Sequence, residues 1–410
     1  NEPTFAAEVN GERDVLRGQQ LIERIVVRMC GRATRRRLTA EHHHCSGTAV
    51  QVPRGNVGGR FLARQQHTFR EAWHHPVGVL GQCIQWSCSA PETLRQWDLA
   101  IAGHEAAIGA ARSAWALAAG DAPADFRLTH FQWLAGAVVE WHLGALRDNG
   151  AAHVARIEQF RADELPHLSP YTAADARKLA CFMATGAGKT LVLHMHLRQF
   201  IAHGLFTPQQ VLLLTPNEAL SRQHSDELAA SGLHGLGVRV AEITKFYVDA
   251  PGARRPKKGV SEPTSRYEGP NLLLVDEGHK GGGSGGERDW REVREALASG
   301  ATEAQAGFTF EFSATFAQIA DKDDGLYDDY ARCVAVDFGY ARFWREGFGK
   351  QPRQINAGTA AGADFALAAG LLAFFQQRLA FAEHPALADT YRVAPPLLAC
   401  VGRDVTAGGA

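Results

Sequence analysis

The sequence has no apolar run long enough to cross a bilayer. Its longest apolar stretch, near residues 365–375, is much shorter than the about 20 residues that a membrane-spanning helix requires. The opening residues, NEPTFAAEVNGERD, also lack the basic and then apolar order of a secretory signal peptide. We therefore expect a cytoplasmic protein without a membrane partner.

The sequence is also poor in cysteine and carries almost no excess charge. Seven cysteines in 410 residues are an odd number scattered along a long chain, which argues against a secreted disulfide framework and favours a reducing compartment. The formal net charge is -1, so the chain is not a polycation. Any contact with nucleic acid must therefore come from a local basic groove.

The chain divides into four regions by pattern. Residues 1–88 are poorly defined, and residues 89–168 are expected to form a helical domain. Its first helix starts with a capping-box pattern, Ser89 with Glu92, and two further helical patterns cover residues 131–147 and 151–164. Residues 169–357 form the third region and residues 358–410 the fourth.

In the third region, short apolar runs alternate with helical patterns. This alternation predicts an α/β fold with a mostly parallel sheet covered by helices on both faces. The predicted strands are 179–183, 211–214, 238–243, 272–275, 308–312 and 334–336, and the predicted helices between them include 191–201, 218–230 and 289–298.

The fourth region combines a helical pattern over residues 363–383 with a strand-like run, LLACV, at 397–401. We expect this strand to open a second sheet. Both ends of the chain read as truncations.

The sequence ATGAGKT at residues 184–190 lies between a predicted strand and a predicted helix. Small residues there let backbone N–H groups approach phosphates, and the helix N-terminus adds partial positive charge. Lys189 would reach the β- and γ-phosphates and Thr190 would ligate Mg²⁺. The strict phosphate-loop pattern has glycine where this chain has Met183, so a plain glycine-rich turn is the alternative.

The sequence NLLLVDEGHK places Asp276 and Glu277 at the end of a fully apolar strand. In a parallel sheet this end lies at the same edge as the glycine-rich loop. One acid, Asp276, would hold Mg²⁺, and its neighbour Glu277 would orient and deprotonate the attacking water. His279 is close enough to sense the γ-phosphate region. Alternatively, the acids only end a strand and His279 is a solvated loop residue.

Taken together, these runs resemble the superfamily 2 DExH-type helicases and translocases. The segments MATGAGKT, LLLTPNEALSRQH, DEGH and SAT occur in the order and spacing of that family's motifs I, Ia, II and III. The amino-acid sequence that flanks these motifs is similar to that of the helicase subunits of type III restriction enzymes, many of which act in bacterial defence against phage. The resemblance covers about residues 178–356 and implies a RecA-like lobe that binds ATP and Mg²⁺.

The resemblance also implies a role for each matching residue. Thr185, Gly186, Ala187, Gly188, Lys189 and Thr190 would bind ATP, and Lys189, Asp276 and Glu277 would form the catalytic centre. His279, Ser313 and Thr315 would couple the nucleotide state to the nucleic-acid site. Thr215, Pro216, Asn217, Thr244 and Lys245 would contact the nucleic-acid backbone, which gives no sequence specificity. Alternatively, these last residues are plain strand ends, and Ser313 and Thr315 are turn residues.

Two features of the family are not found in the sequence. No adenine-reading glutamine motif lies just upstream of Lys178, and no second-lobe motifs are recognised, among them the arginine that stabilises charge on the γ-phosphate. The isolated chain is therefore expected to bind nucleotide and to hydrolyse it poorly.

The resemblance favours a motor on double-stranded DNA, in a restriction or defence system, with methylase or nuclease subunits as candidate partners. An RNA helicase is the first alternative. The second is a nucleotide-binding scaffold in a defence complex, without unwinding.

Three weaker patterns lie outside these motifs. A histidine- and cysteine-rich stretch at residues 30–88 matches no usual zinc-finger spacing, so a polar loop is the preferred interpretation. Basic clusters at residues 32–37 and 254–258 could meet phosphates. GGGSGG at residues 281–286 is typical of a flexible loop.

Overall fold

The computed structural model describes residues 91–123, 126–248, 261–280, 288–299, 306–314, 324–349, 363–386 and 394–399. Those between 91 and 349 belong to one compact unit, and those from 363 to 399 belong to another. In the second unit, helix α12 spans Ala363–Glu383 as predicted. Residues 394–399 form neither helix nor strand, so the strand predicted at 397–401 is not formed in its described part. In the described part of the chain, no helix is both long and apolar enough to cross a membrane.

The first unit is built on a six-stranded, entirely parallel sheet with the order β3-β2-β6-β7-β1-β8. All six predicted strands are confirmed. The fold is thus a RecA-like α/β lobe preceded by helices. The strands are β1 (Lys178–Met183), β2 (Val211–Thr215), β3 (Val238–Glu242), β6 (Leu272–Asp276), β7 (Phe308–Ser313) and β8 (Val334–Phe338).

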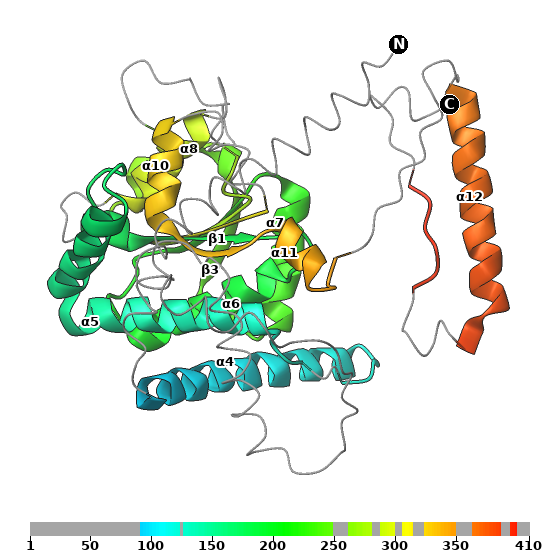
Figure 1. Cartoon of the computed structure of the whole chain (residues 1–410), viewed down its shortest axis with the longest axis horizontal. Coiled ribbons are helices and arrows are strands. Elements are labelled where there is room, and N and C mark those ends of the chain that lie inside the picture. The colour runs from blue at the N-terminus through cyan, green and yellow to red at the C-terminus, as the bar shows by residue number, and fades with distance from the viewer. Residues whose placement is uncertain are drawn as a thin grey trace, which may run out of the picture. The chain divides into compact units, whose positions relative to one another are not determined.

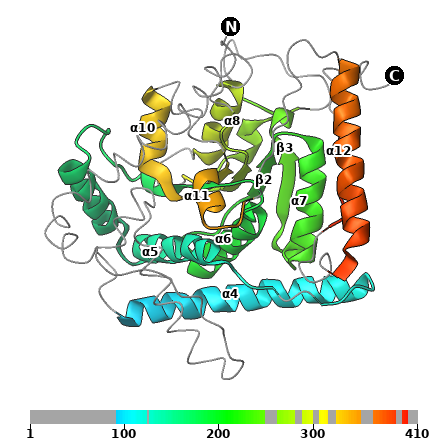
Figure 2. The ribbon, with the colours of Figure 1, turned by 45° about the vertical axis from the view of Figure 1, so that its right-hand side comes forward.

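Helices cover both faces of this sheet (Figure 1). One face carries α5 (His130–Glu164), α6 (Lys189–His203) and α7 (Glu218–Ala230), with α4 (Pro91–Ala118) on their outer side. The other face carries α8 (Arg288–Ala298) and α10 (Asp324–Cys333). Figure 2 shows α7 alongside β2 and β3. The helices predicted between the strands are confirmed.

Helix α5 covers both helical patterns that the sequence shows at 131–147 and 151–164. The two patterns meet at Asn149, whose backbone is not helical (φ −160°, ψ 83°). The Asn149 side chain accepts a hydrogen bond from the Ala152 backbone N–H at 3.1 Å, as an asparagine does at the start of a helix. A local cap inside the element therefore explains the break between the patterns.

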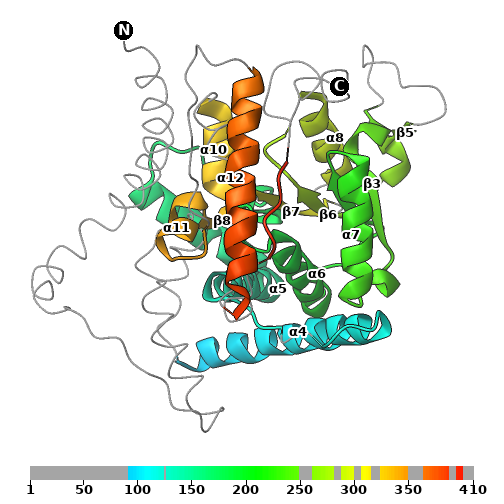
Figure 3. The same cartoon turned by 90° about the vertical axis from the view of Figure 1, so that its right-hand side faces the viewer.

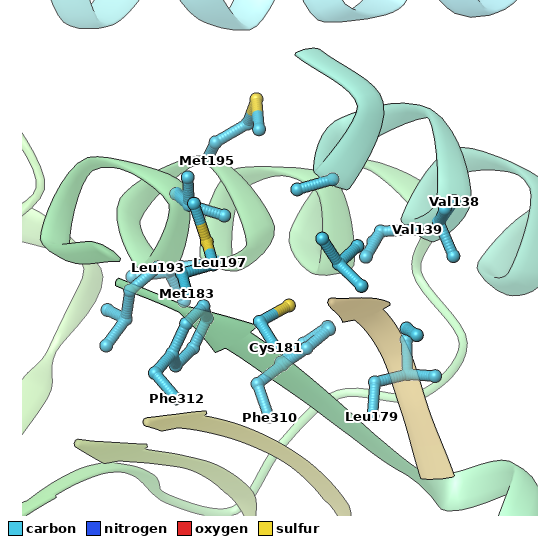
Figure 4. Packing of buried hydrophobic residues seen from close by; sticks show 14 of the residues in the cluster. Val138, Val139, Leu179, Cys181, Met183, Leu193, Met195, Leu197, Phe310 and Phe312 are labelled. Atoms are coloured by element: carbon cyan, nitrogen blue, oxygen red, sulfur yellow. The ribbon is translucent and has the colours of Figure 1, made fainter. Parts of the chain in front are cut away.

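The strands alternate between the two apolar layers. On β7, Phe308, Phe310 and Phe312 pack with α5 and α6, whereas Glu311 meets side chains of α8 and α10. On this first face the side chains of two helices and two strands interdigitate, as Figure 4 shows for Val138 and Val139 of α5, Leu193, Met195 and Leu197 of α6, Leu179, Cys181 and Met183 of β1, and Phe310 and Phe312 of β7.

Shorter elements connect the main ones. A small two-stranded sheet pairs β4 with β5, and helix α11 follows β8 directly. The bounds are η1 (Asp175–Arg177), η2 (His234–Leu236), η3 (Ile243–Lys245), β4 (Phe246–Tyr247), β5 (Glu262–Pro263), η4 (Thr264–Tyr267) and α11 (Tyr340–Arg345).

Candidate functional site

The glycine-rich loop joins β1 to the N-terminus of α6. Gly186 and Gly188 both have positive φ angles, 86° and 77°, which lie in the left-handed region that favours glycine. Thr185 and Gly186 are exposed, and Lys189 and Thr190 are half-buried in the first turn of α6. The loop is therefore open to solvent and presents a helix N-terminus, as a phosphate cradle requires.

Helix α5 holds this loop from the side. Gln132 is buried, and its side-chain Nε2 donates a hydrogen bond to the Ala187 carbonyl at 2.9 Å. Its Oε1 accepts a hydrogen bond from the Thr129 backbone N–H, also at 2.9 Å, in a capping box. A Cβ at Gly188 would lie only 2.4 Å from Gln132 Nε2, so a larger residue here would displace the Gln132 amide from its place and would also adopt an unfavourable positive φ.

The two acids follow the end of β6 at the same edge of the sheet. Asp276 is level with Phe312 of β7, which is level with Cys181 of β1, three residues before the loop starts at Ala184. One strand, β7, thus separates the acids from the loop strand. Since neighbouring strands are about 4.8 Å apart, the two strands that carry the groups are about 10 Å apart.

Glu277 has an unusual backbone conformation. Among the described residues it is the one non-glycine residue with positive φ, at 55°. Its N–H donates a hydrogen bond to the Asp276 side-chain Oδ1 at 3.0 Å. Such a conformation costs roughly 1–3 kcal/mol and is found mostly where the surrounding structure enforces it, often at functional sites.

The Asp276 carboxylate is held from helix α7. The His224 Nε2 lies 2.9 Å from Asp276 Oδ2, and the His224 side chain is 3% exposed. With Nε2 protonated, this ring donates to the carboxylate and fixes its orientation. Asp276 remains partly exposed toward the edge of the sheet, where a cation can reach it.

His279 links the acidic turn to the end of β7. Its Nδ1 lies 2.8 Å from the Ser313 Oγ and 3.2 Å from the Glu277 Oε2. The structure thus brings together two of the three residues expected to couple nucleotide and nucleic-acid sites. Thr315, the third, lies outside the described residues.

A buried ionic network lies behind the acidic turn. Glu311 is 2% exposed; its carboxylate lies 3.2 Å from Lys178 Nζ and accepts a hydrogen bond from the Tyr330 hydroxyl at 2.9 Å. The Gly278 carbonyl accepts a hydrogen bond from Arg294 at 2.7 Å and lies 3.2 Å from the Tyr330 hydroxyl oxygen. Burial raises the pKa of Glu311, but the positive charges of Lys178 and Arg294 outweigh it and hold that pKa below its usual range.

The residues predicted to contact nucleic acid are placed unequally. Thr215 and Pro216 are buried, and the Thr215 hydroxyl bonds the Ser221 hydroxyl at 2.6 Å. Asn217 is exposed, and its side chain caps α7 by accepting from the Leu220 N–H at 2.9 Å. Thr244 and Lys245 are exposed just beyond the end of β3.

A comparison with protein-family models matches the region that holds these segments. Residues 169–322 match the family model described as DEAD/DEAH box helicase. No curated protein and no solved structure matches the chain. The match supports the assignment of this segment to a helicase superfamily and its function as part of an ATP-dependent, helicase-type motor. The helicase-type domain so defined contains the glycine-rich loop, both acids, and the Asn217 and Thr244 segments.

Gln132 and His224 were not foreseen from the sequence. Gln132 lies far upstream on another helix, and no local pattern relates it to the loop. His224 had one usable signal: it lies three residues after Ser221 on the same face of α7, and this face meets the end of β2. The histidine- and cysteine-rich stretch, both basic clusters and GGGSGG lie outside the described residues.

Proposed function

We propose that the helicase-type domain binds ATP with Mg²⁺ at the edge shared by β1 and β6, and that hydrolysis there drives movement on nucleic acid. The observation that carries this proposal is that both groups lie at the same edge of the sheet. The open glycine-rich loop follows the end of β1, the acidic pair lies at the end of β6, and only β7 separates these two parallel strands. An acidic pair on the opposite edge could not have reached the phosphates.

The residues present fit the phosphates and the cation. The first N–H groups of α6 and the loop N–H groups would bind phosphate oxygens, and Lys189 would neutralise their charge. Thr190 and Asp276 would supply the protein oxygens for Mg²⁺, which commonly takes one or two side-chain ligands plus substrate phosphates. When bound, the cation would stabilise negative charge on the β- and γ-phosphates.

Glu277 is the proposed general base. Its carboxylate, which lies 3.2 Å from His279 Nδ1, would accept the proton of the attacking water. His279 contacts both Glu277 and Ser313, so a change at the γ-phosphate would reach the end of β7 through this histidine. Ser313 and the following Thr315 are the proposed couplers to the nucleic-acid site.

The nucleic-acid surface is proposed at the ends of β2 and β3. Asn217, Thr244 and Lys245 are exposed there and would contact sugar and phosphate groups. Thr215 and Pro216, being buried, would act by shaping the backbone of this edge. The resemblance of residues 178–356 to type III restriction helicase subunits favours double-stranded DNA, and a role in restriction or defence, over RNA.

Binding and single-turnover hydrolysis of Mg-ATP by the 410-residue chain test the catalytic assignment. No second-lobe motif is recognised in this sequence, so we expect measurable binding and slow hydrolysis. Lys189→Ala should abolish most binding. Glu277→Gln should keep binding and lower the single-turnover rate about 100-fold or more, the usual contribution of a general base. Arg147→Ala, which removes an exposed positive charge on α5, is the control for a general effect of lost charge on ATP binding.

Two results would contradict this assignment. One is a chain that binds no Mg-ATP, and the other is a Glu277→Gln variant that hydrolyses ATP at the original rate. Comparing ATPase stimulation by double-stranded DNA and by RNA tests the nucleic-acid preference. Stimulation by RNA alone would replace the DNA proposal with an RNA helicase.

A further inference from the structure

Four aromatic side chains gather on α11 and the turn after it. We call Tyr340, Phe343, Trp344 and Phe348 the aromatic rim. Tyr340, Trp344 and Phe348 are 51%, 50% and 43% exposed, whereas Phe343 is buried beneath them at 8%. Large aromatic side chains grouped on a surface commonly mark a binding site.

The aromatic rim adjoins the glycine-rich loop. Helix α11 starts directly after β8, which runs parallel to β1, so it begins at the edge of the sheet where the loop lies. The Ala184 N–H at the start of the loop donates to the Phe338 carbonyl at the end of β8, at 3.0 Å. Phe343 Cζ lies 3.9 Å from where a Cβ on Gly186 would be.

The aromatic rim lies on the side of the loop opposite the acids. In the sheet, β6 is two strands from β1 in one direction and β8 is its neighbour in the other. Figure 3 shows α11 beside β8, at the end of the strand row away from β6 and β3. A nucleotide whose γ-phosphate faces the acids of β6 extends in the other direction from the loop. Its base then reaches the α11 side.

Two members of the aromatic rim, Phe343 and Phe348, are held in place by neighbouring rings. Phe343 and Phe348 are stacked, with ring centroids 5.8 Å apart and planes at 24°. Phe131 of α5 packs edge-on against both rings. Glu346, which lies between the two phenylalanines in the sequence, has its carboxylate Oε2 2.7 Å from His130 Nε2. A surface fixed in this way loses little side-chain freedom when a flat ring is placed on it.

Gln132 contacts the loop directly, and its amide is engaged on both sides. It donates one N–H to the Ala187 carbonyl and accepts from the Thr129 N–H, which fixes the orientation of the amide and leaves one N–H and one oxygen lone pair. Stacking on an aromatic face needs no hydrogen bond to the edge of a base, because every base has a π-face.

We propose that the aromatic rim binds the purine base of the nucleotide by stacking, on Phe348 and Trp344 first. This inference rests on the proposed ATP site and adds to it the base subsite.

Calorimetric titration of the 410-residue chain with Mg-ATP and with Mg-tripolyphosphate, which has no base, tests the proposal. Phe348→Ala and Trp344→Ala should each weaken Mg-ATP binding about 5-fold to 150-fold, the range measured for loss of a base-stacking residue. Binding of tripolyphosphate should stay within about twofold, since the loop itself is intact. Trp115→Ala, at a 51% exposed tryptophan on α4, is the matched control and should change neither constant.

The outcomes separate this inference from the proposed function. Unchanged Mg-ATP affinity in both variants overturns the base subsite and leaves the phosphate site standing. Equal weakening of ATP and tripolyphosphate also overturns it, because α11 then only supports the loop. If the unmodified chain binds neither ligand, the phosphate site itself is refuted, and the base subsite with it.

Discussion

Replacement of Glu311 by glutamine should destabilise the helicase-type domain strongly. The Glu311 carboxylate is 2% exposed and compensates the ammonium group of Lys178 at 3.2 Å, with Arg294 at 4.0 Å. Removing one partner of a buried ion pair costs roughly 3–5 kcal/mol, because the other charge stays buried without compensation. The Lys178 side chain is 34% exposed, so solvent screening places the expected loss near the lower end, about 3 kcal/mol.

Urea unfolding followed by circular dichroism measures this loss as a change in the free energy of unfolding. The control is the double variant Glu311→Leu with Lys178→Met, which removes both charges and should cost clearly less than Glu311→Gln alone. A Glu311→Gln variant within about 0.5 kcal/mol of the original chain, the range of ordinary surface substitutions, would refute the reasoning.

The same network predicts a dependence on pH. The folded-state pKa of Glu311 is lowered, so its carboxylate contributes stability that is complete above the unfolded-state pKa of a glutamate. That stability is lost as the pH falls from there through the folded-state pKa. The double variant lacks this contribution and should lose less stability on acidification than the original chain. Parallel curves for the two proteins would contradict the assignment.

Three further substitutions test the site and the core. His224→Ala should lower Mg²⁺-dependent hydrolysis about 10-fold to 100-fold by releasing Asp276, with Mg²⁺ titration of single-turnover rates as the measurement. Gly188→Ala should weaken Mg-ATP binding, and adding Gln132→Ala should restore only part of it, because that removes the 2.4 Å clash but not the strain of a positive φ. Burial lowers the pKa of His196 to about 3, so on acidification the unfolded chain takes up a proton at this residue before the folded chain does. His196→Leu removes this difference. It should reduce the fall in the free energy of unfolding between pH 6.5 and 3 by up to about 1.4 kcal/mol per pH unit.

The sequence by itself determined the elements and their order. Each of the six main strands is a short run rich in apolar residues, and the spacing of these residues, with the turn residues between the runs, places them without knowledge of the rest of the chain. Alternation with helices then requires parallel strands, whose carboxyl ends share one edge. The glycine-rich loop and the acids could therefore be assigned to one edge from the sequence alone.

Only the tertiary structure decided which distant side chains support this edge. Gln132 reaches Ala187 from a helix that starts 59 residues before the first residue of α6, and His224 reaches Asp276 from another helix across β2. Neither contact has a local signature, because hydrogen bonds between elements depend on how the helices pack on the sheet. The same holds for Glu311: its place in a strand of phenylalanines is visible in the sequence, but its cationic partners come from β1 and α8, which only folding brings together.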